Sequence, residues 1–73
     1  MKPCKRREFI RKLKLLGFDG PFSGSKHQFM NINNCRLTIP SNDEFSGPQI
    51  KMMLREINLL LNNEITNSFW DKL

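Results

Sequence analysis

A pair of asparagines, Asn33 and Asn34, constrains the fold of this chain more than any other feature of its sequence. Asparagine tolerates the positive φ that a two-residue β-turn requires. Extended segments flank the pair on both sides, at residues 26–32 and 35–40. The sequence therefore predicts an antiparallel hairpin that turns at these asparagines, with Ile32 opposite Cys35 as the first pair.

This register sorts the side chains of the hairpin onto two faces. The first face is mostly apolar and must cover a core; it holds Gln28, Met30, Ile32, Cys35, Leu37 and Ile39. The second face is polar and holds His27, Phe29, Asn31, Arg36, Thr38 and Pro40. His27, the only histidine, is therefore expected to point away from the core, beside a turn at residues 23–25.

Segments with helical periodicity lie before and after the hairpin. Apolar residues recur at helical spacing from Lys5 to Leu16, and Gly17 follows as a C-terminal cap. The opposite side of this helix is basic and carries Arg7, Arg11 and Lys14. A second helix is expected to begin at Ser46, shortly before Pro48, and to carry its apolar stripe to about residue 61.

The remaining segments complete an α+β fold. Residues 18–25 are rich in turn formers and include Pro21, so any strand there must be irregular or lie at an edge. We expect two helices on one face of a three-stranded antiparallel sheet. Residues 1–61 form this domain, and residues 62–73 form a C-terminal extension with a short helix. We favour packing of Ile65, Phe69 and Trp70 against the domain over a role in an interface.

The charge of the chain is concentrated in one half. The 73 residues carry a net charge of +5. Residues 1–36 hold nine basic and two acidic side chains, a balance of +7. Such a field attracts polyanions, nucleic acid first and then an anionic membrane surface or an acidic protein. The alternative is a solvated face on a basic protein.

Several classes of function are excluded by what the chain lacks. It is too short for an enzyme with its own cofactor-binding fold, and it has no glycine-rich phosphate loop or Gly-x-Ser-x-Gly motif. The sequence contains no cluster of His, Cys and Asp residues with the spacing of a metal site. Its two cysteines, Cys4 and Cys35, are far apart in the sequence, unlike a zinc or redox motif. The longest apolar run is Leu59–Leu61, far short of a membrane span. We therefore expect a cytoplasmic chain with reduced thiols and no metal or cofactor.

Cleavage of RNA is one reaction that a single histidine with a few nearby cations could catalyse. RNA carries its own nucleophile, the 2′-hydroxyl, so the protein needs a base that works near neutral pH and groups that stabilise charge on the phosphate. His27 could be the base, because imidazole accepts protons in this range. Lys26 or Arg36 and the backbone of Gly24 and Ser25 could contact the phosphate. Arg7, Arg11 and Lys14 of the basic helix are also predicted to bind RNA. The sequence offers no clear general acid for the leaving 5′-oxygen.

The chain resembles the HicA family of bacterial toxins, small mRNA interferases encoded beside HicB antitoxins. The resemblance runs from about Arg6 to about residue 60. It rests on the end of the first helix at residues 16–18, the tetrad Gly24-Ser25-Lys26-His27 followed by Phe29, the strand end at residues 37–40, and residues 53–57 in the second helix.

This resemblance implies the α-β-β-β-α fold of a double-stranded-RNA-binding domain, and it implies that His27 is the catalytic residue. The chain would then be the toxin of a type II toxin-antitoxin system, a metal-independent endoribonuclease (a hydrolase) that cleaves mRNA and is neutralised by a HicB-type antitoxin protein. Three features depart from the family pattern. Ser41 and the residues after it replace a second histidine that members often carry, the closing helix lacks the usual glycine at its end, and the tail from about Asn62 exceeds the family core.

Two other functions remain open. A non-catalytic RNA-binding module would need only Lys and Arg, because double-stranded RNA is recognised by shape, phosphate and 2′-hydroxyl contacts. In that case the cationic residues would bind RNA and His27 would be incidental. A protein-interaction domain would instead use the apolar tail around Phe69 and Trp70, and it would bind RNA weakly at physiological salt.

Overall fold

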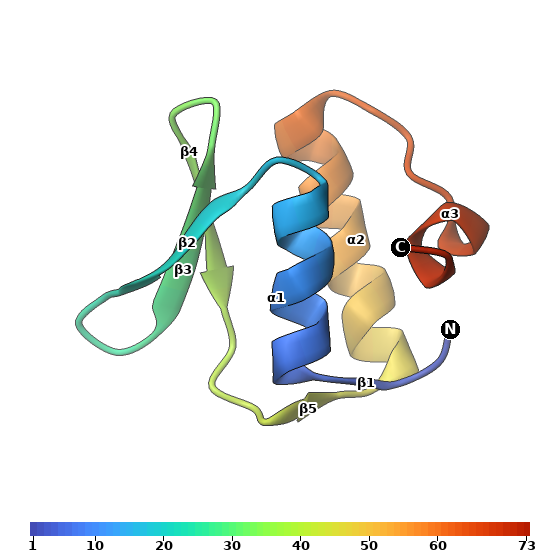
Figure 1. Cartoon of the computed structure of the whole chain (residues 1–73), viewed down its shortest axis with the longest axis horizontal. Coiled ribbons are helices and arrows are strands. Elements are labelled where there is room, and N and C mark those ends of the chain that lie inside the picture. Colours follow the sequence, from blue (N-terminus) through green and yellow to red (C-terminus); the bar gives the residue numbers. More distant parts are fainter.

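The computed structural model describes all residues of the chain, 1–73, as an α+β fold. Its two long helices lie on the same side of a three-stranded antiparallel sheet (Figure 1). No helix combines the length and the apolar character needed to cross a membrane. The elements in chain order are β1 (Cys4–Lys5), α1 (Arg6–Leu15), β2 (Asp19–Ser23), β3 (Gln28–Ile32), β4 (Cys35–Ile39), β5 (Glu44–Phe45), α2 (Gly47–Leu61) and α3 (Asn67–Asp71).

The hairpin of β3 and β4 has the predicted turn and register. Asn33 and Asn34 both have positive φ, at 48° and 63°, and Ile32 pairs with Cys35. The pairing continues without a shift to Gln28 and Ile39. The prediction of an irregular edge strand is also confirmed, because β2 pairs only with β3 and its register shifts between Asp19 and Phe22.

The core lies between the sheet and the helices. It contains thirteen buried apolar residues. The sheet contributes Met30, Leu37 and Ile39, all from the face that the alternation predicted to be buried. The helices contribute Phe9 and Leu13 from α1, and Ile50, Met53, Leu54 and Ile57 from α2. Ser46 caps α2 by accepting a hydrogen bond from the Gln49 amide, and Asn62 ends the helix in the left-handed conformation.

The residues between Pro40 and α2 include a further strand, where the sequence indicated only a loop. Glu44 and Phe45 form a short strand, β5, which pairs with Cys4 and Lys5 of β1. This second sheet lies beside the start of α1 and joins the segment before α1 to the segment before α2 (Figure 1). Phe45 is fully buried, and its ring centroid lies 5.0 Å from that of Phe9. Two-residue strands carry too little alternation to be recognised from sequence.

The C-terminal extension packs against α1 through a short helix. Ile65 and Trp70 are buried, and the Trp70 ring lies 5.3 Å from Phe9, measured between centroids. The Lys12 ammonium group donates to the Trp70 carbonyl oxygen at 2.9 Å and lies 5.2 Å from the indole centroid. Phe69 is the exception to the predicted packing, because it stays 54% exposed.

Candidate functional site

His27 lies at the edge of a shallow depression on the outer face of the sheet. The depression is lined by Gly24, Ser25, Lys26, His27, Phe29, Arg36 and Thr38. His27 itself precedes the first residue of β3 and is exposed, as the register predicted. The structure therefore brings together the predicted base, both predicted phosphate-binding cations of the hairpin and the Gly24-Ser25 turn. Thr38, which pairs with Phe29, is an additional lining residue that the sequence did not single out.

The turn before His27 requires a glycine. The Gly24 amide donates to the His27 carbonyl oxygen at 3.0 Å, which closes the turn. A Cβ atom at position 24 would lie 2.5 Å from that oxygen, so any larger residue would force the backbone apart. The Gly24 amide is thus already paired and is not a free donor for a phosphate. Its role is to shape the turn, and the Ser25 amide remains the backbone candidate for phosphate contact.

The imidazole of His27 is held through one of its two nitrogens. Its Nδ1 atom lies 2.8 Å from the Ser41 hydroxyl oxygen, so one of the two groups donates to the other. When the Nδ1–H donates to Ser41, the Nε2 lone pair is free to accept a proton. Sequence analysis did not assign this role to Ser41. The predicted register was a usable signal, because it placed Pro40 opposite His27 and therefore Ser41 nearby.

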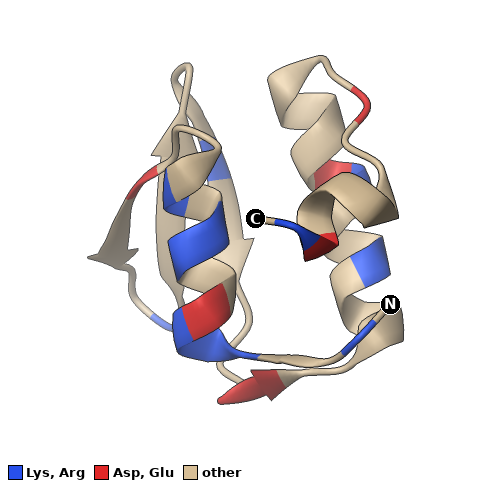
Figure 2. Ribbon diagram, turned by 45° about the vertical axis from the view of Figure 1, so that its right-hand side comes forward, with Lys and Arg blue, Asp and Glu red and all other residues tan.

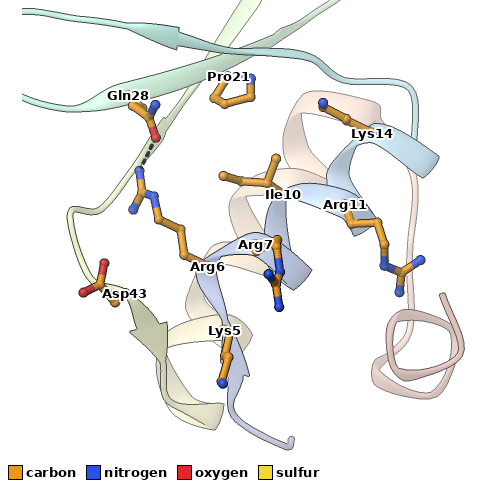
Figure 3. Close-up of a pocket in the computed structure, with 9 residues that line it drawn as sticks. All are labelled: Lys5, Arg6, Arg7, Ile10, Arg11, Lys14, Pro21, Gln28 and Asp43. Carbon is orange, nitrogen blue, oxygen red and sulfur yellow. Dashed lines mark hydrogen bonds between the residues drawn. The ribbon is translucent and has the colours of Figure 1, made fainter.

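Arg6 fixes the segment that carries Ser41. Its Nη1 atom donates to the Pro40 carbonyl oxygen and, at 3.1 Å, to the Asn42 carbonyl oxygen. Its Nη2 atom donates to the Gln28 side chain at 2.8 Å, as Figure 3 shows. The guanidinium group therefore connects both neighbours of Ser41, Pro40 and Asn42, to Gln28, the residue that follows His27. Arg6 was expected only as part of the basic helix.

Two cations in the depression lack an acidic partner. The chain contains one ion pair, between Glu8 and Arg11, so Lys26 and Arg36 pair with no carboxylate. The Arg36 guanidinium carbon lies 3.9 Å from the Phe29 ring centroid. Stacking on an aromatic face orients the guanidinium plane and leaves its N–H groups available to a ligand. The depression is therefore electropositive and contains no acidic side chain.

The remaining predicted cations lie elsewhere, in a groove beside α1. This groove is lined by Lys5, Arg6, Arg7, Ile10, Arg11, Lys14, Pro21, Gln28 and Asp43 (Figure 3). It opens on the helix side of the sheet, because Gln28 belongs to the inner face, whereas Phe29 and Arg36 belong to the outer face. The structure thus divides the predicted RNA-binding residues into two sites. Arg7, Arg11 and Lys14 do not line the depression that contains His27.

Arg11 is the least available cation of the α1 groove. It donates to Glu8 through Nε at 2.8 Å and to the Leu73 carbonyl oxygen through Nη2 at 2.9 Å. The hydrogen bond from Arg11 lowers the pKa of the Glu8 carboxyl group, and the same bond raises the pKa of Arg11. Arg7 and Lys14 form no such ion pair and are the freer cations of this groove.

The other reactive side chains do not form a second centre. Cys4 and Cys35 are free thiols, and burial raises the pKa of the Cys4 thiol, which keeps it protonated at neutral pH. No three His, Cys, Asp or Glu side chains gather closely enough to share a metal ion.

Comparisons of this chain with protein-family models, curated proteins and solved structures find no match. Its function must therefore be argued from the residues and their geometry.

Proposed function

We propose that the protein is a metal-independent endoribonuclease with His27 as its general base. The observation that carries the proposal is the environment of His27: an exposed imidazole held through Nδ1 by Ser41, beside two cations without acidic partners. An exposed base with nearby positive charge suits a reaction in which the substrate supplies the nucleophile.

In this mechanism Nε2 of His27 accepts the proton of a ribose 2′-hydroxyl. The O2′ atom attacks the adjacent phosphorus, the bond from phosphorus to O5′ breaks, and a 2′,3′-cyclic phosphate forms. Lys26, Arg36 and the Ser25 amide stabilise the charge on the phosphate oxygens. The leaving O5′ atom takes a proton from water or from Lys26, because the depression contains no carboxylic acid and no second histidine.

The biological role follows from the resemblance to HicA toxins. We propose that the substrate is mRNA, that the fold is that of a double-stranded-RNA-binding domain, and that a HicB-type antitoxin neutralises the protein by covering the surface around His27. The order α1-β2-β3-β4, followed after the two-residue strand β5 by α2, supports the fold assignment. Family members often carry a second histidine near the position of Ser41. In this protein Ser41 contacts His27, which supports the inclusion of this position in the site.

The proposal is tested by the substitution His27→Ala. Because His27 is exposed, its loss creates no cavity, and we expect a change in unfolding free energy below about 1 kcal/mol. RNA cleavage should fall by roughly 10² to 10⁴-fold, which is the usual contribution of a general base. Growth arrest on expression should disappear while the variant remains soluble and folded.

The products and the metal requirement provide a second readout. Cleavage by the unmodified protein should continue in EDTA and should leave a 2′,3′-cyclic phosphate. A dependence on Mg²⁺, or full cleavage by His27→Ala, would reject the mechanism. An unfolded His27→Ala protein would instead identify a structural histidine.

A non-catalytic RNA-binding module is the second candidate. The lack of a carboxylic acid and of a second histidine in the depression favours it. This candidate predicts tight binding of RNA with no cleavage, and it predicts that His27→Ala changes neither property.

A further inference from the structure

The outer face of the sheet carries an aromatic pair, Phe22 and Phe29, that is not part of the hydrophobic core. Phe22 of β2 is paired directly with Phe29 of β3, so both rings lie on the face opposite Met30 and Leu37. The ring centroids are 5.6 Å apart and the planes are inclined by 38°. No helix covers this face, because α1 and α2 lie on the other side of the sheet (Figure 1). Phe22 is 43% exposed.

The aromatic pair continues into the depression beside His27. Phe29 lines the depression, and the Arg36 guanidinium group lies 3.9 Å from the centroid of its ring. Phe22, Phe29 and Arg36 therefore form one row of flat groups across three strands, which we call the aromatic row. Such a row offers a stacking surface at one end and cationic hydrogen-bond donors at the other.

We propose that the aromatic row binds a base of single-stranded nucleic acid by stacking on Phe22, while Arg36 and Lys26 contact the adjoining phosphates. Exposed aromatic rings on a sheet are used in this way because every base has a π-face and only an unpaired base can reach the ring. The positive charge without acidic partners complements a phosphate backbone. Bases inside a duplex are stacked on their neighbours, so their faces are not open to the Phe22 ring.

This inference rests on the proposed function in one respect, because a base on Phe22 would place the neighbouring ribose near His27. It adds to that function by specifying that the RNA substrate is single-stranded. Binding itself does not require cleavage. A single-stranded oligodeoxynucleotide is therefore the appropriate probe, since it has no 2′-hydroxyl nucleophile.

The first experiment introduces a fluorescent reporter with Phe22→Trp. Tryptophan preserves the stacking surface, and the native Trp70 is only 1% exposed and should contribute a constant background. We expect the oligodeoxynucleotide to quench the new tryptophan on binding. The matched control is Phe69→Trp, which places an exposed tryptophan on α3, away from the aromatic row. Its emission should not change, and the duplex of the same sequence should quench neither protein.

The second experiment measures affinity with Phe22→Leu, which keeps apolar character but removes the ring. We expect dissociation constants for the single strand about 5- to 150-fold higher, the range that follows from the loss of one base-aromatic stack. Phe69→Leu is the control and should bind like the unmodified protein. Circular dichroism of each variant confirms that the edge strand β2 still folds.

The outcomes separate this inference from the proposed function. Single-strand binding that depends on Phe22, in a protein that never cleaves RNA, would support the aromatic row and reject the nuclease. Cleavage of RNA by a protein whose Phe22→Leu variant binds the single strand normally would retain the nuclease and overturn the aromatic row. An unchanged emission of Phe22→Trp on addition of the single strand would also overturn it.

Discussion

At the scale of single residues, the chemistry of the candidate site depends on one short hydrogen-bonded chain. Arg6 holds the carbonyl groups of Pro40 and Asn42, the Ser41 between them contacts Nδ1 of His27, and Nε2 is left for the substrate. Arg6 and Ser41 touch no reacting atom in this scheme. In the proposed mechanism they act as positioning residues, because they hold the Nδ1 side of the imidazole and so fix where the ring lies.

The substitution Ser41→Ala tests this positioning role. The loss of one hydrogen bond to a neutral partner is worth about 0.5 to 1.5 kcal/mol, so we expect cleavage to fall by about 2- to 13-fold. If the bond acts only on the imidazole, the reduction should appear in kcat and not in stability. RNA cleavage measures kcat, and circular dichroism measures the melting temperature. Ser68→Ala, at an exposed position of α3, is the control and should change neither. A rate equal to that of the unmodified protein would show that Ser41 does not orient His27.

At the scale of elements, α3 shows how two adjacent aromatic residues can have different roles. Trp70 is 1% exposed and contacts Phe9, whereas Phe69 points outward and is 54% exposed. The ammonium group of Lys12 is also committed to this contact, since it donates to the Trp70 carbonyl oxygen. The extension is therefore part of the core and supports α1, which in turn carries Arg6.

Substitution of these two aromatic residues should have unequal effects on stability. Trp70→Ala leaves a cavity beside Phe9 and should reduce the free energy of unfolding by about 3 to 5 kcal/mol. A domain of this size has little stability to lose, so we expect this variant to be largely unfolded. Phe69→Ala should cost less than about 1 kcal/mol. Urea denaturation followed by circular dichroism measures both values, and similar losses for the two variants would contradict the packing of α3.

The same elements explain what could be predicted from the sequence. The hairpin followed from Asn33 and Asn34, because their backbone conformation fixes a register and the register fixes which side chains face the core. The exposure of His27 followed from that register. The aromatic row could not be predicted, because Phe29 pairs with Phe22 of β2. The register of β2 is irregular, and no local sequence signal determines it. Likewise, the hydrogen bonds of Arg6 join residues that are 22 to 36 positions apart.

At the scale of the whole molecule, positive charge lies on both sides of the sheet. The α1 groove opens on the helix side, and Lys and Arg residues recur along α1 (Figure 2). The His27 depression opens on the outer face. The two sites approach each other at one end of the sheet, where Gln28 lines the groove and His27 lines the depression. A strand of RNA that contacts both sites must pass around this end, which a flexible single strand can do.

The salt dependence of RNA binding tests whether both sites are used. Each phosphate contact lowers the log-log slope of affinity against salt concentration by about 0.7 for a single strand. Binding through both sites should therefore give a slope of several units, and Arg7→Gln or Lys14→Gln in the α1 groove should each reduce its magnitude by about 0.7. Lys51→Gln, an exposed position of α2 outside both sites, is the control and should leave the slope unchanged. Equal slopes for all of these variants would restrict RNA to the depression around His27, because only its cations would then remain to release counterions.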